Sequence, residues 1–299
     1  LARAAAGSDA DRARAIAALE KTLEDEAAAV RAASAVALAD LKAKEALPKL
    51  LVAIEDADQM VRQMAIVALG EIRDDRAVPR LRRCLKDERA EIRFQAIIAF
   101  VRIADAEEAA DAILSASSDD DENVRYIALR SGEDRVGEET LRERVATSAE
   151  KSLKDSSSHV AVAAAIFLAK AKRSAGRKLI ESVILGTVRV QKEDEREAVE
   201  IAGELDMRDL QKELERRAWG LGSKVRDTCA FHAKIALARM RHPRATAEIE
   251  ADLRSPRRET RDAAVVAAGR AKMRELKNLI EKIADVDADL RKAALEELA

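Results

Sequence analysis

The chain has 299 residues, of which 48% are hydrophobic, 37% charged and only 2% aromatic, and its formal net charge is −2. Alanine occurs 63 times, whereas the β-branched and aromatic residues typical of sheets are few. The composition therefore excludes an all-β or mixed-sheet fold. No apolar run reaches the roughly 18 residues of a membrane helix, which argues against membrane insertion, and the hydrophobic content excludes a disordered chain.

A short motif recurs along the first half of the chain. It places an Asp five residues before an aliphatic residue and six before an Arg, at 25–31, 56–62, 87–93 and 119–125. An alanine-rich stretch follows each copy. After Val61, for example, Ala65, Ala68, Leu69 and Ile72 share one face of a helix. Each motif therefore predicts the start of an amphipathic first helix.

A second helix follows the first in each repeat. The segments 47–54 and 78–85 align at a 31-residue offset, with Pro48 and Pro79 in register. Proline is well tolerated in the first turn of a helix, where its missing N–H has no intrahelical partner in any case. A fixed period of helix pairs predicts a stacked solenoid.

The second half of the chain keeps the period less regularly. Asp155 and Asp285 again stand five residues before Val160 and Leu290. Between them the best matches to the aliphatic and Arg positions are Glu195 with Arg196, Val225 with Arg226, and Thr260 with Arg261. We expect regular repeats over 1–130, an irregular repeat and possible bend over 131–154, and divergent repeats over 155–299. A bend and a tolerated insertion both stay open for the irregular segment.

The pattern Asp-x-x-x-x-Val-Arg-x-x-Ala-x-x-Ala-Leu, complete between Asp56 and Leu69, resembles the short bacterial HEAT repeats related to those of phycobilisome lyase subunits. The resemblance is strong over 12–129 and loose over 155–299. It implies an all-α fold, a right-handed α-solenoid or superhelix of about nine HEAT-like helix pairs, and it leaves the function open. Because the sequence starts at Leu1 and closes on an unpaired first helix, we expect a slice of a longer, N-terminally cut solenoid.

The motif residues themselves are expected to form a structural ladder. The Asp suits an N-cap, and the Arg is expected to reach the loop of an adjacent repeat, as the resemblance implies. The other interpretation is a row of catalytic carboxylates or phosphate-binding arginines. The ladder comprises Asp25, Arg31, Asp56, Arg62, Asp87, Arg93, Asp119, Arg125, Asp285 and Arg291.

No catalytic or metal-binding motif is recognisable in the sequence. The three histidines, His159, His232 and His242, show neither metal-ligand spacing nor a nucleophile arrangement, so we expect no catalytic residues, no metal and no cofactor. Cys84 and Cys229 are too far apart to suggest a disulfide framework, which favours buried reduced thiols and a cytoplasmic location.

Charge is distributed unevenly along the chain. Residues 1–150 carry 23 basic and 31 acidic side chains, a net of −8, leaving 31 basic and 25 acidic, a net of +6, for residues 151–299. The resemblance to HEAT solenoids implies that the second helices line the concave face, where partners dock. Trp219 is open to two interpretations, a packing residue or a contact residue. The partner-binding candidates on these helices are Arg208, Lys212, Arg216, Arg217, Trp219, Arg274 and Lys277.

These features favour a non-catalytic scaffold that binds a protein partner, acidic or otherwise charged, on the concave face of the solenoid. The alternative, suggested by the same resemblance, is a lyase-type or chaperone-like subunit that acts on a protein-bound cofactor. Binding to a nucleic-acid backbone ranks third. It is disfavoured because the pI is about 6.1 and because the few aromatic residues mostly fall at core positions.

Overall fold

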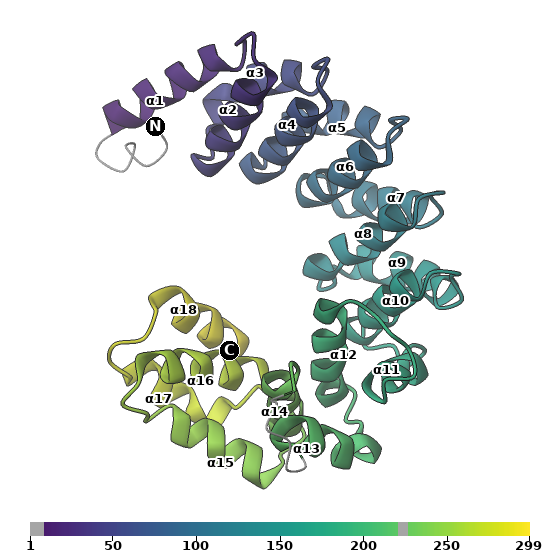
Figure 1. Ribbon diagram of the computed structural model, residues 1–299, viewed down its shortest axis with the longest axis vertical. Coiled ribbons are helices and arrows are strands. Elements are labelled where there is room, and N and C mark those ends of the chain that lie inside the picture. The colour runs from purple at the N-terminus through teal and green to yellow at the C-terminus, as the bar shows by residue number, and fades with distance from the viewer. Residues whose placement is uncertain (1–8, 221–226) are drawn as a thin grey trace. The chain divides into compact units, whose positions relative to one another are not determined.

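The computed structural model describes residues 9–220 and 227–299, and these residues form eighteen α-helices and no strand (Figure 1). Eight helix pairs lie between two single helices, α1 and α18. The prediction of an all-α solenoid of about nine helix pairs is therefore confirmed. The chain divides into two compact units, residues 1–152 and 153–299, hereafter unit 1 and unit 2.

Unit 1 is built on the regular repeats. Its helices are α1 (Asp9–Thr22), α2 (Ala28–Asp40), α3 (Leu47–Ala53), α4 (Gln59–Ile72), α5 (Val78–Cys84), α6 (Ala90–Ile103), α7 (Ala106–Ala116), α8 (Glu122–Ser131) and α9 (Glu139–Ser152). The helices α2, α4, α6 and α8, which follow the Asp–Arg motifs, pack directly on one another. Small residues allow this close approach: a Cβ atom on Gly70 of α4 would lie 3.0 Å from the Cα atom of Ala99 in α6. Alanine and glycine thus set the spacing of the layer.

Unit 2 repeats the plan with more variation. Its helices are α10 (Ser158–Lys170), α11 (Arg177–Ile184), α12 (Lys192–Glu204), α13 (Gln211–Trp219), α14 (Ala230–Arg239), α15 (Pro243–Asp252), α16 (Arg258–Arg270), α17 (Lys277–Lys282) and α18 (Ala288–Glu297). Within it, α12 packs closely on α14 and α16 on α18, whereas α14 and α16 meet more sparsely. Val225 and Arg226, which the sequence placed at a motif position, lie outside the described residues.

The motif helices form the inner layer of each unit. In unit 1 the motif helices α2, α4, α6 and α8 pack tightly side by side, and in unit 2, where the corresponding helices are α10, α12, α14, α16 and α18, α12 packs tightly on α14 and α16 on α18. The other layer is more open: α3, α5 and α7 contact one another only sparsely, as do α11, α13, α15 and α17, although α7 and α9 are in close contact. In a curved stack the crowded layer is the inner one and the spread layer the outer one. Figure 1 shows this order within each unit. The expectation that the second helices line the concave face was therefore wrong, because the helices that carry the small residues are the ones that can crowd together.

Most motif helices end in a turn that reverses the chain sharply. At the end of α2, Lys42 adopts a left-handed backbone with φ of 46°, and the N–H of Ala43 donates to the carbonyl of Leu38. Lys172, Asp206, Arg241 and Lys272 also have positive φ. The residue after the turn is buried in the core at Ala43, Met207 and Met273. A buried C-terminal anchor of this kind offsets the cost of a left-handed conformation without glycine.

The irregular segment connects the two kinds of repeat. After α8, a 3-10 turn at Glu133–Arg135 leads into α9, and Arg135 donates to the main-chain carbonyls of Val101 and Ala104 in the preceding repeat. The limits of the three predicted segments and the possible bend within 131–154 stay predictions. In the part of the chain that the structure describes, no helix combines the length and hydrophobicity needed to cross a membrane.

Candidate protein-binding surface

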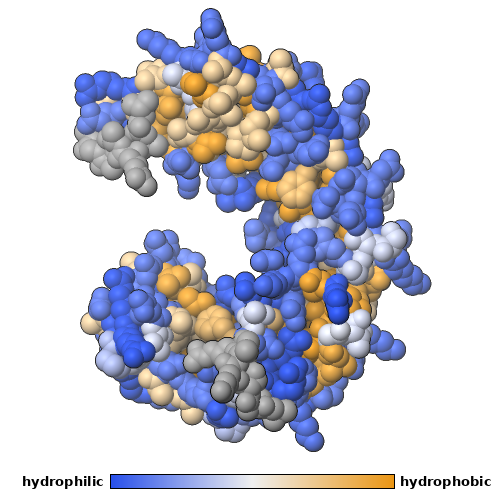
Figure 2. All heavy atoms as spheres, viewed as in Figure 1, coloured by the Kyte–Doolittle hydropathy of each residue, from blue (hydrophilic) through white to orange (hydrophobic). Residues whose placement is uncertain are grey.

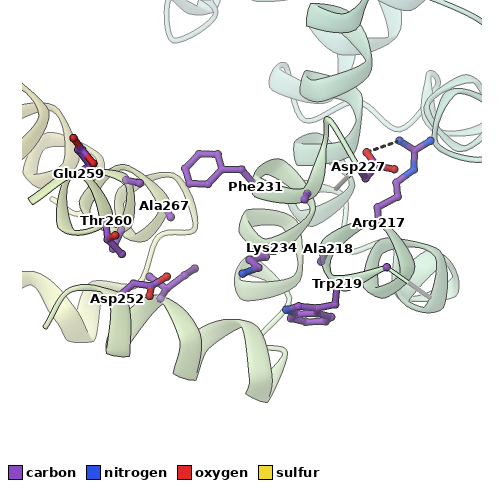
Figure 3. Close-up of a pocket in the computed structure, with 15 residues that line it drawn as sticks. Arg217, Ala218, Trp219, Asp227, Phe231, Lys234, Asp252, Glu259, Thr260 and Ala267 are labelled. Carbon is purple, nitrogen blue, oxygen red and sulfur yellow. Dashed lines mark ion pairs between the residues drawn. The ribbon is translucent and has the colours of Figure 1, made fainter. Parts of the chain in front are cut away.

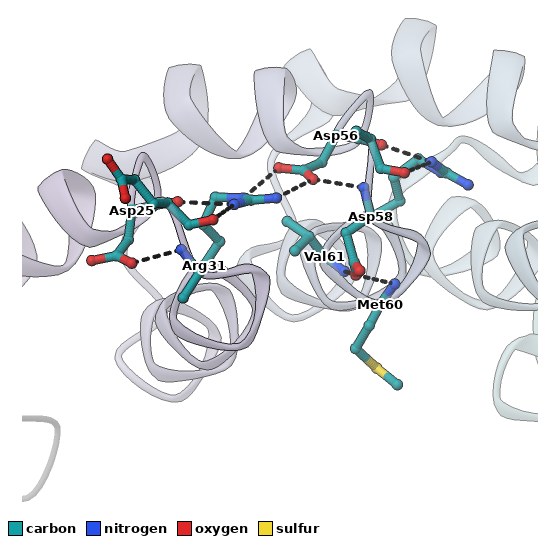
Figure 4. A network of polar contacts seen from close by, with 10 residues as sticks. Asp25, Arg31, Asp56, Asp58, Met60 and Val61 are labelled. Atoms are coloured by element: carbon teal, nitrogen blue, oxygen red, sulfur yellow. Dashed lines mark hydrogen bonds and ion pairs between the residues drawn. The ribbon is translucent and has the colours of Figure 1, made fainter.

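The Asp–Arg motif forms an inter-repeat network in unit 1 (Figure 4). The Nε and Nη2 atoms of Arg31 donate to the two carboxylate oxygens of Asp56, at 2.8 and 2.7 Å. Its Nη1 atom donates to the carbonyls of Asp25 and Glu26, in its own loop. One guanidinium thus ties together two successive loops, and Arg93 makes the same bidentate pair with Asp119 at 2.8 and 2.7 Å.

The motif carboxylates do not cap the helices that follow. Asp56 accepts from the N–H of Asp58, two residues on and still outside the helix, and Asp58 is the N-cap, accepting from Met60 and Val61. Asp87 likewise accepts only from the loop N–H of Arg89. The expected N-cap role of the motif Asp was therefore wrong. Its side chain closes a tight turn and leaves the other oxygen positions for the Arg of the preceding repeat.

Arg62 is held differently from Arg31 and Arg93: it donates to the carbonyls of Asp56 and Ala57, at 2.7 and 3.3 Å, and makes no bond to Asp87. Arg125 donates to the carbonyls of Asp119 and Asp120 in its own loop. In unit 2, Arg261 reaches Asp285 at 2.9 Å, and Arg291 donates to the carbonyl of Ile283. We call each arginine with the loop groups that it binds a loop brace, and the loop braces differ in the number and kind of their hydrogen bonds.

The electrostatics of the paired carboxylates match this structural use. Hydrogen bonds from Arg31 lower the pKa of Asp56, and they outweigh the partial burial that raises it. The side chains of Arg31 and Asp56 are only 16% and 13% exposed. An ionised carboxylate with its oxygens already occupied is poorly suited to general acid–base chemistry. The three histidines are also engaged, His159 with Asp194, His232 with Glu200 and His242 with Glu215.

The inner layer of unit 1 presents an apolar surface. On each motif helix, the side directed away from the outer layer repeats at i, i+3, i+4 and i+7, and apolar side chains stand on this side of α2, α4, α6 and α8. Val36, Val67 and Ile98 occupy equivalent positions, whereas Glu91, Gln95 and Arg130 interrupt the surface. Val36 is 40% and Met60 55% exposed, and the others are half-buried. We call this surface the inner face; it comprises Val36, Met60, Met64, Val67, Phe94, Ile98, Tyr126 and Ile127. Figure 2 shows apolar surface over α2 and α4, bordered by hydrophilic residues.

Acidic residues follow one edge of the inner face. They stand at or just before the N-terminal ends of the four motif helices, and we call them the acidic rim: Glu26, Asp58, Glu91, Asp120 and Glu122. Arg89, the N-cap residue of α6, is a basic side chain among them. Glu91 and Glu122 are exposed and make no ion pair within the part of the chain that the structure describes. The edge is therefore negative, whereas the opposite edge is neutralised by pairs such as Glu71 with Arg102.

The predicted basic candidates lie on the outer layer of unit 2. Arg208, in the turn before α13, pairs with Asp206 at 3.0 Å, and Arg216 pairs with Glu213. Lys212 is exposed beside them. Arg274 and Lys277 belong to the turn before α17 and to α17 itself, with α15 between the two groups. The structure thus does not join these residues into one patch, and several of their charges are already compensated. Their role in binding stays a prediction.

Arg217 is not a surface residue. Its side chain is 7% exposed, it donates to Glu195 at 2.8 Å and to the carbonyl of Ile184 at 2.7 Å, and Asp227 lies 3.9 Å away. The prediction that Arg217 is a docking residue was wrong. The sequence of one helix shows which side is polar, but it does not show that a neighbouring repeat covers this position.

The side chain of Trp219 also makes contacts within the protein. Its Nε1 donates to Glu248 at 3.0 Å, and the guanidinium carbon of Arg244 lies 4.1 Å from the ring centroid. The ring of His242 is 5.4 Å away. These contacts join α13 to α15 and favour the packing interpretation of this residue.

A pocket opens in unit 2 between α13, α14, α15 and α16, where α14 and α16 meet sparsely (Figure 3). It has a volume of about 520 Å³. Phe231, 37% exposed, projects from α14 toward Glu259 and Ala267 of α16, and Asp252 and Lys234 lie below it. The walls are small and apolar, and most of the charges are acidic. Among the described residues no group of three or more side chains could hold a metal ion.

The residues that sequence reasoning missed are the apolar ones of the inner face. Phe94 and Tyr126 are half-buried and Phe231 is exposed, so the expectation that aromatic residues mostly occupy core positions holds for Phe100 and Phe167, which are buried, and in part for Trp219, which packs against the core. A signal was present: Met60, Met64 and Val67 repeat with helical spacing, but about 100° away from the core face. Such a second apolar stripe indicates a surface that something else can cover.

Comparison with known proteins identifies the repeat family over part of the chain. The family model described as HEAT repeats matches residues 47–133, which confirms the predicted resemblance. No curated protein sequence matches. The solved structure of YibA from Escherichia coli is similar with a TM-score of 0.51 and 16% identity, over 84% of this chain and 91% of that one. The complex of CpcE and CpcF of phycocyanin lyase from Nostoc sp. PCC7120 is similar with a TM-score of 0.53 and 16% identity, over 79% and 94%. At this identity both show a shared fold alone.

Proposed function

Because residues 47–133 are HEAT repeats and the flanking helices repeat their two-layer plan, we propose that the protein is a non-catalytic scaffold whose inner face in unit 1 binds a protein partner. The observation that carries the proposal is that exposed and half-buried apolar side chains stand on the same side of four successive helices, with Val36, Val67 and Ile98 at equivalent positions. An isolated exposed valine is ordinary on a protein surface, but a contiguous apolar band marks an interaction site.

The chemistry of the band supports a protein partner. Aromatic residues and methionine are enriched in the centres of protein interfaces, and Phe94, Tyr126, Met60 and Met64 supply them here. The helices beneath are fixed by the loop braces and by close packing, so the surface is already ordered before a partner arrives. Such order reduces the entropy that binding must overcome.

The proposal is tested with the double variant Val36→Glu/Met60→Glu. Both side chains are exposed, so these changes are expected to cost about 0.5 kcal/mol or less each in folding stability. Val52→Glu is the matched control, because Val52 is 71% exposed on α3 in the outer layer. Each protein is used as bait in an extract of the source cells. We expect partners recovered by the wild type and by Val52→Glu to be lost from the double variant. If the double variant recovers the same partners as the wild type, the proposal that the inner face binds them is rejected.

The alternative function is a lyase-type or chaperone-like subunit for a protein-bound cofactor, and its support is the fold shared with the CpcE–CpcF complex. The pocket of unit 2 is the place where such a group would enter. Its lining holds three carboxylates, Asp227, Asp252 and Glu259, and two cations, Arg217 and Lys234. Because Arg217 pairs with Glu195 and Lys234 with Glu248, the anionic propionates of a tetrapyrrole would meet net repulsion there. The two functions are separated by absorbance: a chromophore that co-purifies with the chain or is transferred by it would favour the alternative.

The basic residues at α13, Arg208, Lys212 and Arg216, are a second candidate contact site, for an acidic partner. Reversal of Arg208, Lys212 and Arg216 to Glu would remove that contact and leave the inner face intact. We place this activity in a reducing, cytoplasmic compartment. The support is that Cys84 and Cys229 are both buried free thiols, and that burial raises the pKa of Cys84 to about 11.

A further inference from the structure

We propose that the segment received by the inner face of unit 1 is a cationic amphipathic helix of a partner protein. This inference rests on the proposed function and adds the secondary structure and charge of the partner. Three features of the structure support it: the backbone of the motif helices, the acidic rim and the length of the inner face.

The backbone of the inner layer favours a helical partner over an extended one. The N–H and C=O groups along α2, α4, α6 and α8 are paired within their own helices, so the surface has no free sheet edge. An extended segment laid on it would leave its own backbone groups facing apolar side chains without partners, which is costly. A helix satisfies its backbone internally and can bury one apolar side.

The size of the band matches a helix of moderate length. Four helices packed about 8 to 10 Å apart span roughly 25 to 30 Å from the first axis to the last. A helix of about 18 residues is roughly 27 Å long. A partner helix that crosses the motif helices would therefore meet Val36 on α2, Met64 and Val67 on α4, Ile98 on α6 and Ile127 on α8. The flexible side chain of methionine adapts to partners of different shape.

The acidic rim sets the charge of the partner. Glu91 and Glu122 are exposed, make no ion pair among the described residues and stand beside the N-terminal ends of α6 and α8. Glu26 and Asp120 extend this edge in the preceding loops. A partner helix with lysine or arginine along its polar side would bring opposite charges to this edge, whereas an acidic helix would meet repulsion. Residues 1–150 as a whole carry a net charge of −8, which also accelerates the approach of a cationic segment.

The inference is tested with three labelled 18-residue peptides and the whole chain, using fluorescence anisotropy. The first has leucine at i, i+3, i+4 and i+7 and lysine elsewhere, the second replaces every lysine by glutamate, and the third scrambles the first. We expect saturable binding of the lysine peptide only. Val36→Gln/Met60→Gln, which removes the apolar contacts without adding charge, should weaken it at least tenfold, and Val52→Gln should leave it unchanged. Glu91→Gln/Glu122→Gln should weaken it by about two- to fivefold per charge, the range of exposed ion pairs.

The outcomes separate the inference from the function on which it rests. If the lysine and scrambled peptides bind alike, or if Val36→Gln/Met60→Gln binds the lysine peptide as well as the wild type does, the attraction is general and the inference is overturned. If the glutamate peptide binds equally well and the inner-face variant releases both, the binding face stands but the charge preference falls. Sedimentation of the chain alone supplies one more outcome: a dimer abolished by Val36→Glu/Met60→Glu would make a second copy the occupant and overturn the inference.

Discussion

The loop braces of unit 1 differ in a way that can be measured by comparing Arg93→Ala with Arg62→Ala. Both arginines donate through Nη1 to two carbonyls of their own loop. Only Arg93 adds the bidentate pair with Asp119, whose side chain is 14% exposed. Arg62 has no such carboxylate and therefore serves as an internal reference for the part that the carbonyl bonds contribute.

The expected magnitude follows from this difference. Hydrogen bonds to charged groups contribute about 1.5 to 3 kcal/mol each at most, and a partly buried pair retains more of that than an exposed one. We expect Arg93→Ala to lower the free energy of unfolding by about 3 kcal/mol and Arg62→Ala by about 1 kcal/mol. The double variant Arg93→Ala/Asp119→Ala should lose less than the sum of the single losses, because the single variant leaves the carboxylate of Asp119 without its partner.

Urea unfolding followed by circular dichroism at 222 nm measures these losses, and because both arginines lie in unit 1 they affect the same transition. Acid provides a second check. Burial raises the pKa of Asp119, but bonds from Arg93 and from the loop backbone lower it further, so the net shift is downward. The contribution of Arg93 should be fully present above pH about 4, the unfolded pKa of Asp, and fade as the pH falls below it. Equal losses for Arg93→Ala and Arg62→Ala would refute the reasoning.

Two further predictions concern unit 2 and its packing. Gly203→Ala would place a Cβ atom 2.7 Å from the backbone of α14 and should destabilise the protein by about 1 to 3 kcal/mol in urea unfolding, whereas Gly137→Ala, with nothing within 4 Å, should cost little. Burial raises the pKa of Glu248, but bonds from Lys234 and Trp219 among others lower it to about 2. Glu248→Gln should therefore cost about 1 to 2 kcal/mol at pH 7, a difference that shrinks as the pH falls from about 4.5 toward 2, measured by the fluorescence of the sole tryptophan.

Periodicity made the fold predictable. The recurrence of Val61, Ile92 and Val124 at fixed spacing identifies the buried side of α4, α6 and α8, and all three are at most 1% exposed. At the same motif position of α2 and α18, Val30 and Leu290 are 38% and 37% exposed. The same recurrence could not tell which layer is the inner one. That depends on how closely the helices approach, and the deciding contacts are those of single small residues such as Gly70 against Ala99. Such contacts join segments about thirty residues apart and leave no local signal.

The functional surface was harder to predict than the fold. Charge was the obvious feature of the sequence, and it drew attention to Arg208, Arg216 and Arg217. Two of these pair with acids on the surface and the third is buried against Glu195. A sequence that is 37% charged makes many such internal pairs, so a basic residue on a predicted helix is weak evidence of a docking site.

Comparing equivalent positions in successive repeats is a better criterion for a binding site. Residues required for packing stay the same from repeat to repeat, whereas residues at the surface can change. At a core column, Ala65 and Ala96 recur unchanged and are fully buried, since a larger side chain would push the helices apart. At the neighbouring inner-face column the corresponding residues are Met64 and Gln95, with Ile127 one repeat further on. Met64 packs in part against the core, but Gln95 at the equivalent position shows that packing does not require an apolar residue there. A position whose side chain changes from one repeat to the next is not fixed by packing within the solenoid. Apolar residues at such a position therefore indicate a surface that a partner covers.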